Sequence, residues 1–153
     1  IAEKIAGQLA RHLVSYGGAF LIIDYGKNDP QGDSLQAVAA HKPANIFLDP
    51  GSADLSHWVD FSVLRRAALD EGARFIGPIT QGSFLSRIGI GSRAERAANA
   101  SKKETRRELF SAVDRLVSAH HMGSAFKVSL ILPPGRGLPP GFDENETDWR
   151  SML

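Results

Sequence analysis

The sequence predicts an α/β fold, in which helices pack on part of a doubly wound sheet. Helical and strand patterns alternate along the chain, which is typical of sheets built from strand, helix and strand units. One strand is apolar on both faces, which indicates helices on both sides of the sheet. The three strands that can be recognised are too few for a complete doubly wound sheet, so we expect about half of one.

The first expected element is a helix over residues 1–16, followed by a buried strand. Apolar residues recur every fourth position from Ile1 to Leu13, and Gly17 ends the helix. The apolar run from Ala19 to Asp24 is the strand. Because the chain starts without Met and already inside a helical pattern, we expect its 153 residues to be the C-terminal part of a longer protein.

A long loop and a second strand follow. Residues 26–51 carry turn signals and no sustained period, which predicts a loop. A helix from Ser62 to Glu71, capped by Asp60 or Ser62, then leads to a strand from Ala73 to Thr80. A strand, a helix and a strand at this spacing predict a right-handed parallel crossover.

Helices dominate the next part of the chain. Short helices are expected at residues 84–88 and 92–98, and a longer one from Ser101 to Gly123. Serine followed three residues later by glutamate, at Ser92 and again at Ser101, predicts a capping box at the start of the last two helices.

A strand and a tail complete the expected elements. Apolar side chains alternate from Ala125 to Leu132, which favours an antiparallel strand over a second buried parallel one. Residues 133–153 are rich in Pro and Gly and then acidic. We therefore expect an extended or loosely ordered tail.

The composition excludes several classes of function. The 18 basic and 17 acidic residues give a net charge of +1, which gives no support for nucleic-acid binding. No cysteine is present, so disulfides, thiolate metal sites and a cysteine nucleophile are excluded. No apolar run approaches the roughly 20 residues that span a bilayer. We expect a soluble, intracellular protein of one domain, without membrane insertion.

The end of the first strand is one candidate site. Ligands of open α/β sheets bind beyond the carboxyl ends of the strands, and Asp24, Tyr25 and Gly26 stand at such an end. Gly26 would allow a close turn while Asp24 and Tyr25 face a ligand. Equally, Asp24 would cap a turn and Tyr25 would shield the sheet edge, and the residues alone leave both interpretations open.

An acidic cluster with one histidine is the other candidate. The stretch DPGSADLSHWVDF brings together Asp49, Asp54, His57 and Asp60, a combination able to bind a metal, supply acid and base chemistry, or hold a guanidinium group. The alternative is two turns and two helix caps. Metal binding is the weakest of these options, because no second histidine lies nearby in the sequence.

Four stretches together resemble one family. GGAFLIIDYG, DPGSADLSHWVDFSVL, GPITQGSFLSRIGI and MGSAFKVSLIL resemble the C-terminal half of the MidA-like methyltransferases, a family similar to the mitochondrial complex I assembly factor that methylates an arginine. The resemblance runs from about Gly17 to Leu132. It implies the Rossmann-like sheet of class I S-adenosylmethionine-dependent methyltransferases. The strands recognised here would be the fifth, sixth and seventh, with the antiparallel last strand beside the fifth.

The resemblance also implies domain boundaries and a cofactor. Residues 1–132 would be the C-terminal part of a methyltransferase domain whose N-terminal half is absent, and residues 133–153 a tail. S-adenosylmethionine is the implied cofactor. Its glycine-rich loop belongs to the N-terminal half of the family's domain, so we assign no cofactor-binding or metal-binding residue in this chain.

The part of the domain present in this chain would form the side of the ligand crevice that binds the methyl acceptor, at the carboxyl ends of the strands. Residues from three positions along the chain would line this acceptor side: Asp24, Tyr25 and Gly26; Asp54, His57 and Asp60; and Gln81 and Gly82 after the next strand. Methyl transfer to arginine needs carboxylates that orient the guanidinium and a group that takes its proton. The aspartates would orient the acceptor, and His57 or an aspartate would relay the proton.

The implied function is methyl transfer to a protein arginine, in a subunit of the respiratory complex I type. The longer protein would carry this activity, and the 153 residues alone are expected to be inactive. The expected location is the bacterial cytoplasm or, alternatively, the mitochondrial matrix. A rival function is a non-catalytic α/β module for assembly or scaffolding. A nucleotide-binding dehydrogenase half is a third option, but the sequence lacks its glycine fingerprint.

Overall fold

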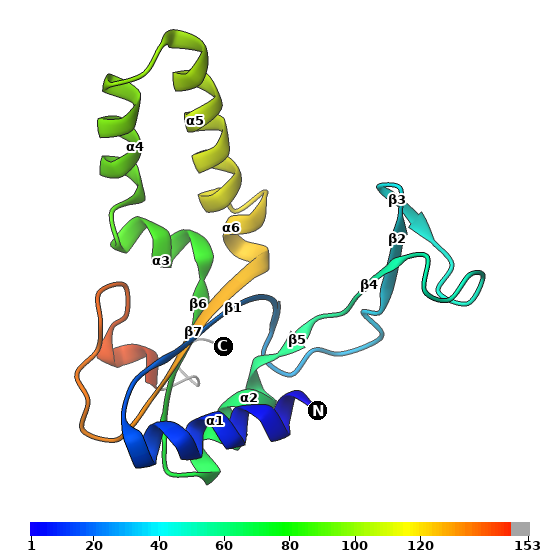
Figure 1. Cartoon of the computed structure of the whole chain (residues 1–153). Helices are drawn as coiled ribbons and strands as arrows, with labels where there is room; N and C mark the ends of the chain where they lie inside the picture. The colour runs from blue at the N-terminus through cyan, green and yellow to red at the C-terminus, as the bar shows by residue number, and fades with distance from the viewer. Residues whose placement is uncertain (148–153) are drawn as a thin grey trace.

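A four-stranded sheet lies at the centre of the protein, with two arms projecting from it (Figure 1). The computed structural model describes residues 1–147. The helices are α1 (Ala2–Tyr16), α2 (Phe61–Asp70), α3 (Gln81–Arg87), α4 (Ile90–Asn99), α5 (Lys103–Val117), α6 (Met122–Ala125) and the 3-10 helix η1 (Glu144–Thr147). The strands are β1 (Phe20–Lys27), β2 (Gln36–Ala39), β3 (Lys42–Ala44), β4 (Asp54–Ser56), β5 (Val59–Asp60), β6 (Arg74–Thr80) and β7 (Phe126–Leu132).

The strand order of the central sheet is β5-β1-β7-β6, and β7 runs antiparallel to both of its neighbours. β1 and β6 are therefore parallel to each other, as the predicted crossover requires. The antiparallel direction of the last strand and its place beside β1 are confirmed. The two-residue strand β5 pairs in parallel with the other edge of β1, at Gly26 and Lys27.

Helices α1 and α2 cover one face of the sheet. Small residues of α1, such as Ala6 and Ala10, pack together with the fully buried Phe61 of α2. Phe75 of β6 and Ile131 of β7 complete the same apolar cluster. Because residues two apart on a strand share a face, this cluster fixes which side of each strand points toward the helices.

The tail, which we expected to be extended or loosely ordered, has no helix or strand from residue 133 to 143, but in the part that the structure describes it packs on the sheet. Leu138 and Phe142 pack on the second face of the sheet, and the Phe142 ring centroid lies 5.3 Å from that of Phe84. Two arginine–glutamate ion pairs attach the segment further. Its apolar residues thus cover the sheet despite the prolines and glycines around them. Residues 148–153 of the expected tail lie outside the described residues.

Strand β1 is longer than the sequence predicts, because it continues through Asp24 and Tyr25 to Lys27. Pairing with β7 extends to Tyr25, and pairing with β5 begins at the next residue, so the backbone has partners beyond the expected end. On the face away from α1 and α2, Leu21 and Ile23 are 43% and 48% exposed. Within residues 1–147, the expected helical cover on both faces is therefore incomplete over β1.

The predicted loop over residues 26–51 is wrong in part, because strands form within it. β2, β3 and β4 build a separate sheet of order β3-β2-β4, which projects from the body as an arm (Figure 1). Strands of three or four residues are too short to show a period in the sequence. The arm exposes three apolar side chains, Phe47, Leu48 and Leu55, at 81%, 84% and 62%.

Helices α4 and α5 form the second projection (Figure 1). Neither predicted capping box forms. α4 begins after Gly89, whose φ is 85°, so Ser92 lies inside the helix. Ser101 donates its hydroxyl to a carbonyl oxygen in the last turn of α4, at 2.7 Å, and so does not open α5. α5 ends at Val117 rather than Gly123.

Among the residues described, no helix is long and apolar enough to cross a membrane.

Candidate active site

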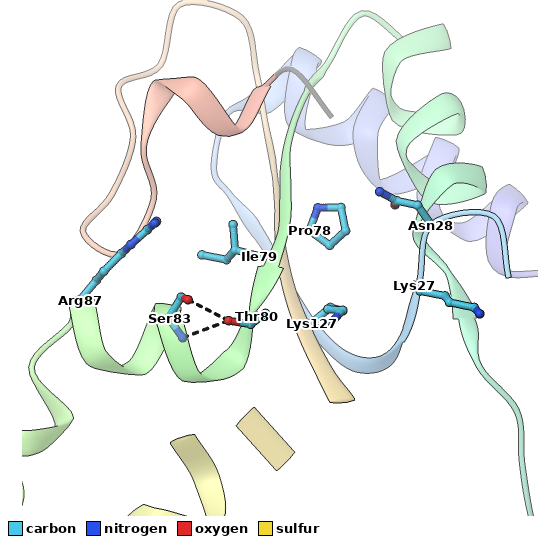
Figure 2. A pocket seen from close by; sticks show the side chains of 8 residues that line it. All are labelled: Lys27, Asn28, Pro78, Ile79, Thr80, Ser83, Arg87 and Lys127. Carbon is cyan, nitrogen blue, oxygen red and sulfur yellow. Dashed lines mark hydrogen bonds between the residues drawn. The ribbon is translucent and has the colours of Figure 1, made fainter. Parts of the chain in front are cut away.

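A pocket of about 460 Å³ opens where β1 and β6 end and β7 begins (Figure 2). This is the position at which open α/β sheets bind their ligands. Among the described residues that line it, three carry cationic side chains and none an acidic one. The lining consists of Lys27, Asn28, Pro78, Ile79, Thr80, Ser83, Arg87 and Lys127.

Lys127 occupies the middle of this pocket. In the sheet it is the direct partner of Asp24 on β1 and of Thr80 on β6. Its Nζ donates to the carbonyl oxygen of Ser124 at 2.5 Å. Among the described residues no carboxylate forms an ion pair with it. Burial without such a partner lowers the pKa of Lys127.

The other two cations of the pocket already have partners. The Nζ of Lys27 lies 4.4 Å from the centroid of the Trp58 ring, a cation–π contact. Arg87 forms an ion pair with the buried carboxylate of Glu146, and it also donates to the carbonyl oxygen of Gly141 at 3.3 Å. Lys127 is thus the cation of the pocket with the least compensated charge.

Two hydroxyl groups complete the polar lining. Thr80 is the N-cap of α3, and its Oγ1 accepts from the backbone N–H of Ser83 at 3.2 Å. The Thr80 hydroxyl donates to Ser83 Oγ at 2.8 Å. The hydroxyl hydrogen of Ser83 is consequently available to a further acceptor.

The predicted residues Asp24, Tyr25 and Gly26 lie within β1, next to this pocket. Asp24 faces Lys127 across the ladder, and one of its oxygens accepts from the backbone N–H of Tyr25 at 2.8 Å. The ring centroid of Tyr25 lies 5.8 Å from that of Phe126. A Cβ on Gly26 would overlap the backbone of β5, so glycine allows the two strands to pair.

Asp60 begins α2 and acts as its N-cap. Its Oδ1 accepts from the backbone N–H of Ser62 at 2.9 Å and from the hydroxyl of the same residue at 2.5 Å. It also accepts from the backbone N–H of Asp29 at 3.2 Å. The predicted capping role of Asp60 is therefore confirmed, and its position in β5 keeps it near the end of β1.

Asp54 and His57 do not join Asp60 in a compact cluster. Asp54 belongs to β4 in the arm, where it pairs with Val38. His57 is exposed, and its Nδ1 donates to the carbonyl oxygen of Trp58 at 2.8 Å. In residues 1–147 no three His, Cys, Asp or Glu side chains are grouped so that they could hold a metal ion.

Gln81 and Gly82 lie at the start of α3 and contact the end of α5. The amide nitrogen of the buried Gln81 donates to the carbonyl oxygen of Leu116 at 2.9 Å. A Cβ on Gly82 would overlap the carbonyl oxygen of Val117. In this structure both residues hold the helical projection against the sheet.

Sequence reasoning missed the cationic residues of the pocket. Lys127 is the one charged residue in a strand whose other residues are Ser129 and apolar side chains, and that was the signal available in the sequence. Its pairing with Asp24 is seen in the structure. The sequence alone does not show that this strand lies between β1 and β6. Lys27 and Thr80 lie at the pocket because each is the last residue of its strand, β1 and β6 respectively.

Comparison with known proteins gives the family. The family model described as "Putative S-adenosyl-L-methionine-dependent methyltransferase" matches residues 1–79, about half of the chain. The chain belongs to this methyltransferase family. Its relatives include the mitochondrial protein arginine methyltransferase NDUFAF7 of Xenopus tropicalis, 36% identical over 136 residues, and that of Homo sapiens, 35% identical over 136 residues. Each match covers 88% of this chain and 31% of the relative. The chain thus spans about a third of the length of these curated relatives.

Two crystal structures of Burkholderia thailandensis proteins share the methyltransferase fold of this chain. One, of an uncharacterized protein, matches with a TM-score of 0.76 and 26% identity, over 90% of this chain and 39% of that one. The other, a "likely methyl transferase" bound to S-adenosyl-homocysteine, matches with a TM-score of 0.71 and 25% identity, over 95% and 38%. These matches confirm the predicted Rossmann-like arrangement, in which an antiparallel last strand lies beside the first strand seen here.

Proposed function

We propose that the full-length protein transfers a methyl group from S-adenosylmethionine to an arginine of another protein. The observation that carries this proposal is the antiparallel β7 inserted between β1 and β6, in a chain of a methyltransferase family. The arginine methyltransferases among the relatives support arginine as the acceptor. A subunit of the respiratory complex I type is the proposed acceptor protein. The mitochondrial relatives favour the matrix as its location, with the bacterial cytoplasm as the alternative.

Residues 1–132 would form the C-terminal part of the methyltransferase domain, with residues 133–153 as a tail attached to it. Among the described residues, the edge of β1 away from β7 has no partner strand from Phe20 to Tyr25. Leu21 and Ile23 beside this edge are half-exposed. A further strand could pair there. The cofactor would be held mainly by residues outside this chain, and the 153 residues alone would be inactive.

Asp24 is the proposed carboxylate for the acceptor. When bound, the cofactor supplies an electrophilic methyl group. Asp24 would orient the guanidinium through charge-assisted hydrogen bonds and take the proton that its nitrogen loses. Tyr25, packed on Phe126, lies on the opposite face of the sheet from Asp24 and would shield the end of the sheet there. Gly26 would hold β5 close to β1 and so fix the end of the strand.

The other predicted residues would assist on the acceptor side. Asp60 would hold α2 and the backbone of Asp29 in place near the strand end. His57 and Asp54 lie toward the arm, where they would contact the acceptor protein or relay a proton to solvent. Gln81 and Gly82 would support the wall of the pocket formed by α3.

Radiolabelled methyl transfer tests this proposal. The full-length protein is incubated with labelled S-adenosylmethionine and extract from cells lacking its gene, and labelled arginine is identified by mass spectrometry. Asp24→Asn should lower kcat by at least about a hundredfold and change cofactor affinity by less than about twofold. Asp70→Asn, on the exposed end of α2, is the matched control and should behave like wild type. Equal losses of kcat and of cofactor affinity would contradict the role of Asp24.

A non-catalytic assembly module is the second candidate function. The projecting arm favours it, because Phe47, Leu48 and Leu55 expose large apolar side chains there that a partner protein could cover. Calorimetry with S-adenosylmethionine separates the two functions. A full-length protein that binds no cofactor would support the assembly module.

A further inference from the structure

We propose that Lys127 binds a carboxylate of the acceptor protein, on an acidic residue close in sequence to the methylated arginine. This inference rests on the proposed function and adds the chemistry by which the acceptor is selected. It starts from the pocket between β1, β7 and α3, whose lining, within the part of the chain that the structure describes, contains three cationic side chains and no acidic one. A pocket of this charge disfavours the guanidinium itself.

Lys127 is the cation that still needs a partner. Arg87 is neutralised by Glu146, and Lys27 lies over the ring of Trp58. Among residues 1–147, the hydrogen-bond partner of Lys127 is the carbonyl oxygen of Ser124 alone. An ammonium group has three donors, so two remain for a ligand. Figure 2 shows Lys127 between Thr80 and Lys27, in the middle of the pocket.

The neighbouring groups fit a carboxylate. The hydroxyl hydrogen of Ser83 is free to donate, because its oxygen already accepts from Thr80. The side-chain amide of Asn28 adds a further donor at the rim. A carboxylate has two oxygens with about four acceptor sites, which suits donors converging from several sides. Burial lowers the pKa of Lys127, and a bound anion would raise that pKa again, because an opposite charge nearby stabilises the ammonium form.

The register of the sheet relates this site to the arginine. Asp24 and Lys127 are direct partners in the β1–β7 ladder, so their side chains lie on the same face. Directly opposed residues have Cβ atoms about 5 Å apart. An extended acceptor segment would therefore place its arginine at Asp24 and a glutamate or aspartate, one or two residues away, at Lys127.

Peptide binding to the full-length protein tests this inference. Two fluorescent ten-residue peptides carry the same central arginine, flanked two residues away on each side by glutamate in one peptide and by glutamine in the other. Fluorescence anisotropy at low salt should show about tenfold tighter binding of the glutamate peptide to wild type. Lys127→Met should abolish this preference, and Lys127→Arg should retain most of it. Lys103→Met removes the same charge from the exposed surface of α5 and should leave the preference unchanged.

Several results would overturn the inference. One is that wild type binds the two peptides equally or binds neither detectably. Another is that Lys127→Met still prefers the glutamate peptide. A cofactor affinity that falls tenfold in Lys127→Met while the peptide preference stays would assign the carboxylate to the methionine part of S-adenosylmethionine instead. The peptide preference is measured without methyl transfer. An active enzyme without the preference therefore refutes this inference alone, and a protein with the preference that binds no cofactor refutes the methyltransferase proposal alone.

Discussion

Two substitutions of Asp60 can distinguish a structural role of this residue from a catalytic one. Its Oδ1 accepts three hydrogen bonds, two from Ser62 at the start of α2 and one from the backbone of Asp29. Loss of an N-cap costs about 1 kcal/mol, and the exposed bond to Asp29 adds about 0.5 kcal/mol. Asp60→Ala should therefore lower the free energy of unfolding by about 1.5 kcal/mol. Domains of 150–250 residues lose about 2–4 °C in Tm per kcal/mol and larger ones lose less, so Tm of the full-length protein should fall by a few degrees.

Asp60→Asn keeps an oxygen acceptor at the same place and removes the charge. It should lower the free energy of unfolding by less than about 0.5 kcal/mol, because Asn caps helices as well as Asp does. Thermal unfolding of the full-length variants, followed by circular dichroism, measures both effects. If Asn destabilises as much as Ala, or if Ala leaves Tm unchanged, the capping account is wrong. If Asn is stable but loses methyl transfer per folded molecule, the charge of Asp60 acts in catalysis.

Three further predictions test the packing and the pocket. Gly82→Ala should destabilise by about 2 kcal/mol in urea unfolding, because its Cβ would overlap the carbonyl oxygen of Val117, whereas Gly91→Ala, with open space around it, should not destabilise. Phe142→Ala should cost about 2 kcal/mol, because this partly buried ring packs in two apolar clusters, and an unchanged urea midpoint would contradict that. Since burial lowers the pKa of Lys127, the unfolded state binds more protons as the pH approaches the ordinary lysine value of about 10.4. The stability of wild type should therefore rise relative to Lys127→Met over that range, and parallel stability curves would contradict the shift.

The sequence alone was sufficient to predict those elements whose apolar pattern extends over many residues or depends only on close neighbours in the chain. The helix over residues 1–16, the strands at β1, β6 and β7, and the Asp60 cap depend on apolar periodicity or on neighbours within a few residues. The antiparallel direction of β7 followed from its alternation. The candidate residues Asp24, Tyr25 and Gly26 were proposed from the predicted end of the first strand, and β1 continues beyond them to Lys27.

The features that were missed depend on contacts between distant residues. The short strands of the arm form only by pairing with one another, and none is long enough to show a period. Phe142 is anchored because β6 and β7 present an apolar face to it. Lys127 becomes a candidate binding residue only once β7 lies between β1 and β6, beside the hydroxyls of Thr80 and Ser83.

Cofactor binding by the full-length protein tests the central claim most directly. Isothermal titration with S-adenosylmethionine should give one site per chain, and S-adenosylhomocysteine, the product of methyl transfer, should compete for it. The related Burkholderia thailandensis structure is bound to S-adenosyl-homocysteine, which supports this expectation. A folded full-length protein that gives no binding heat with either compound and transfers no labelled methyl group would contradict the account.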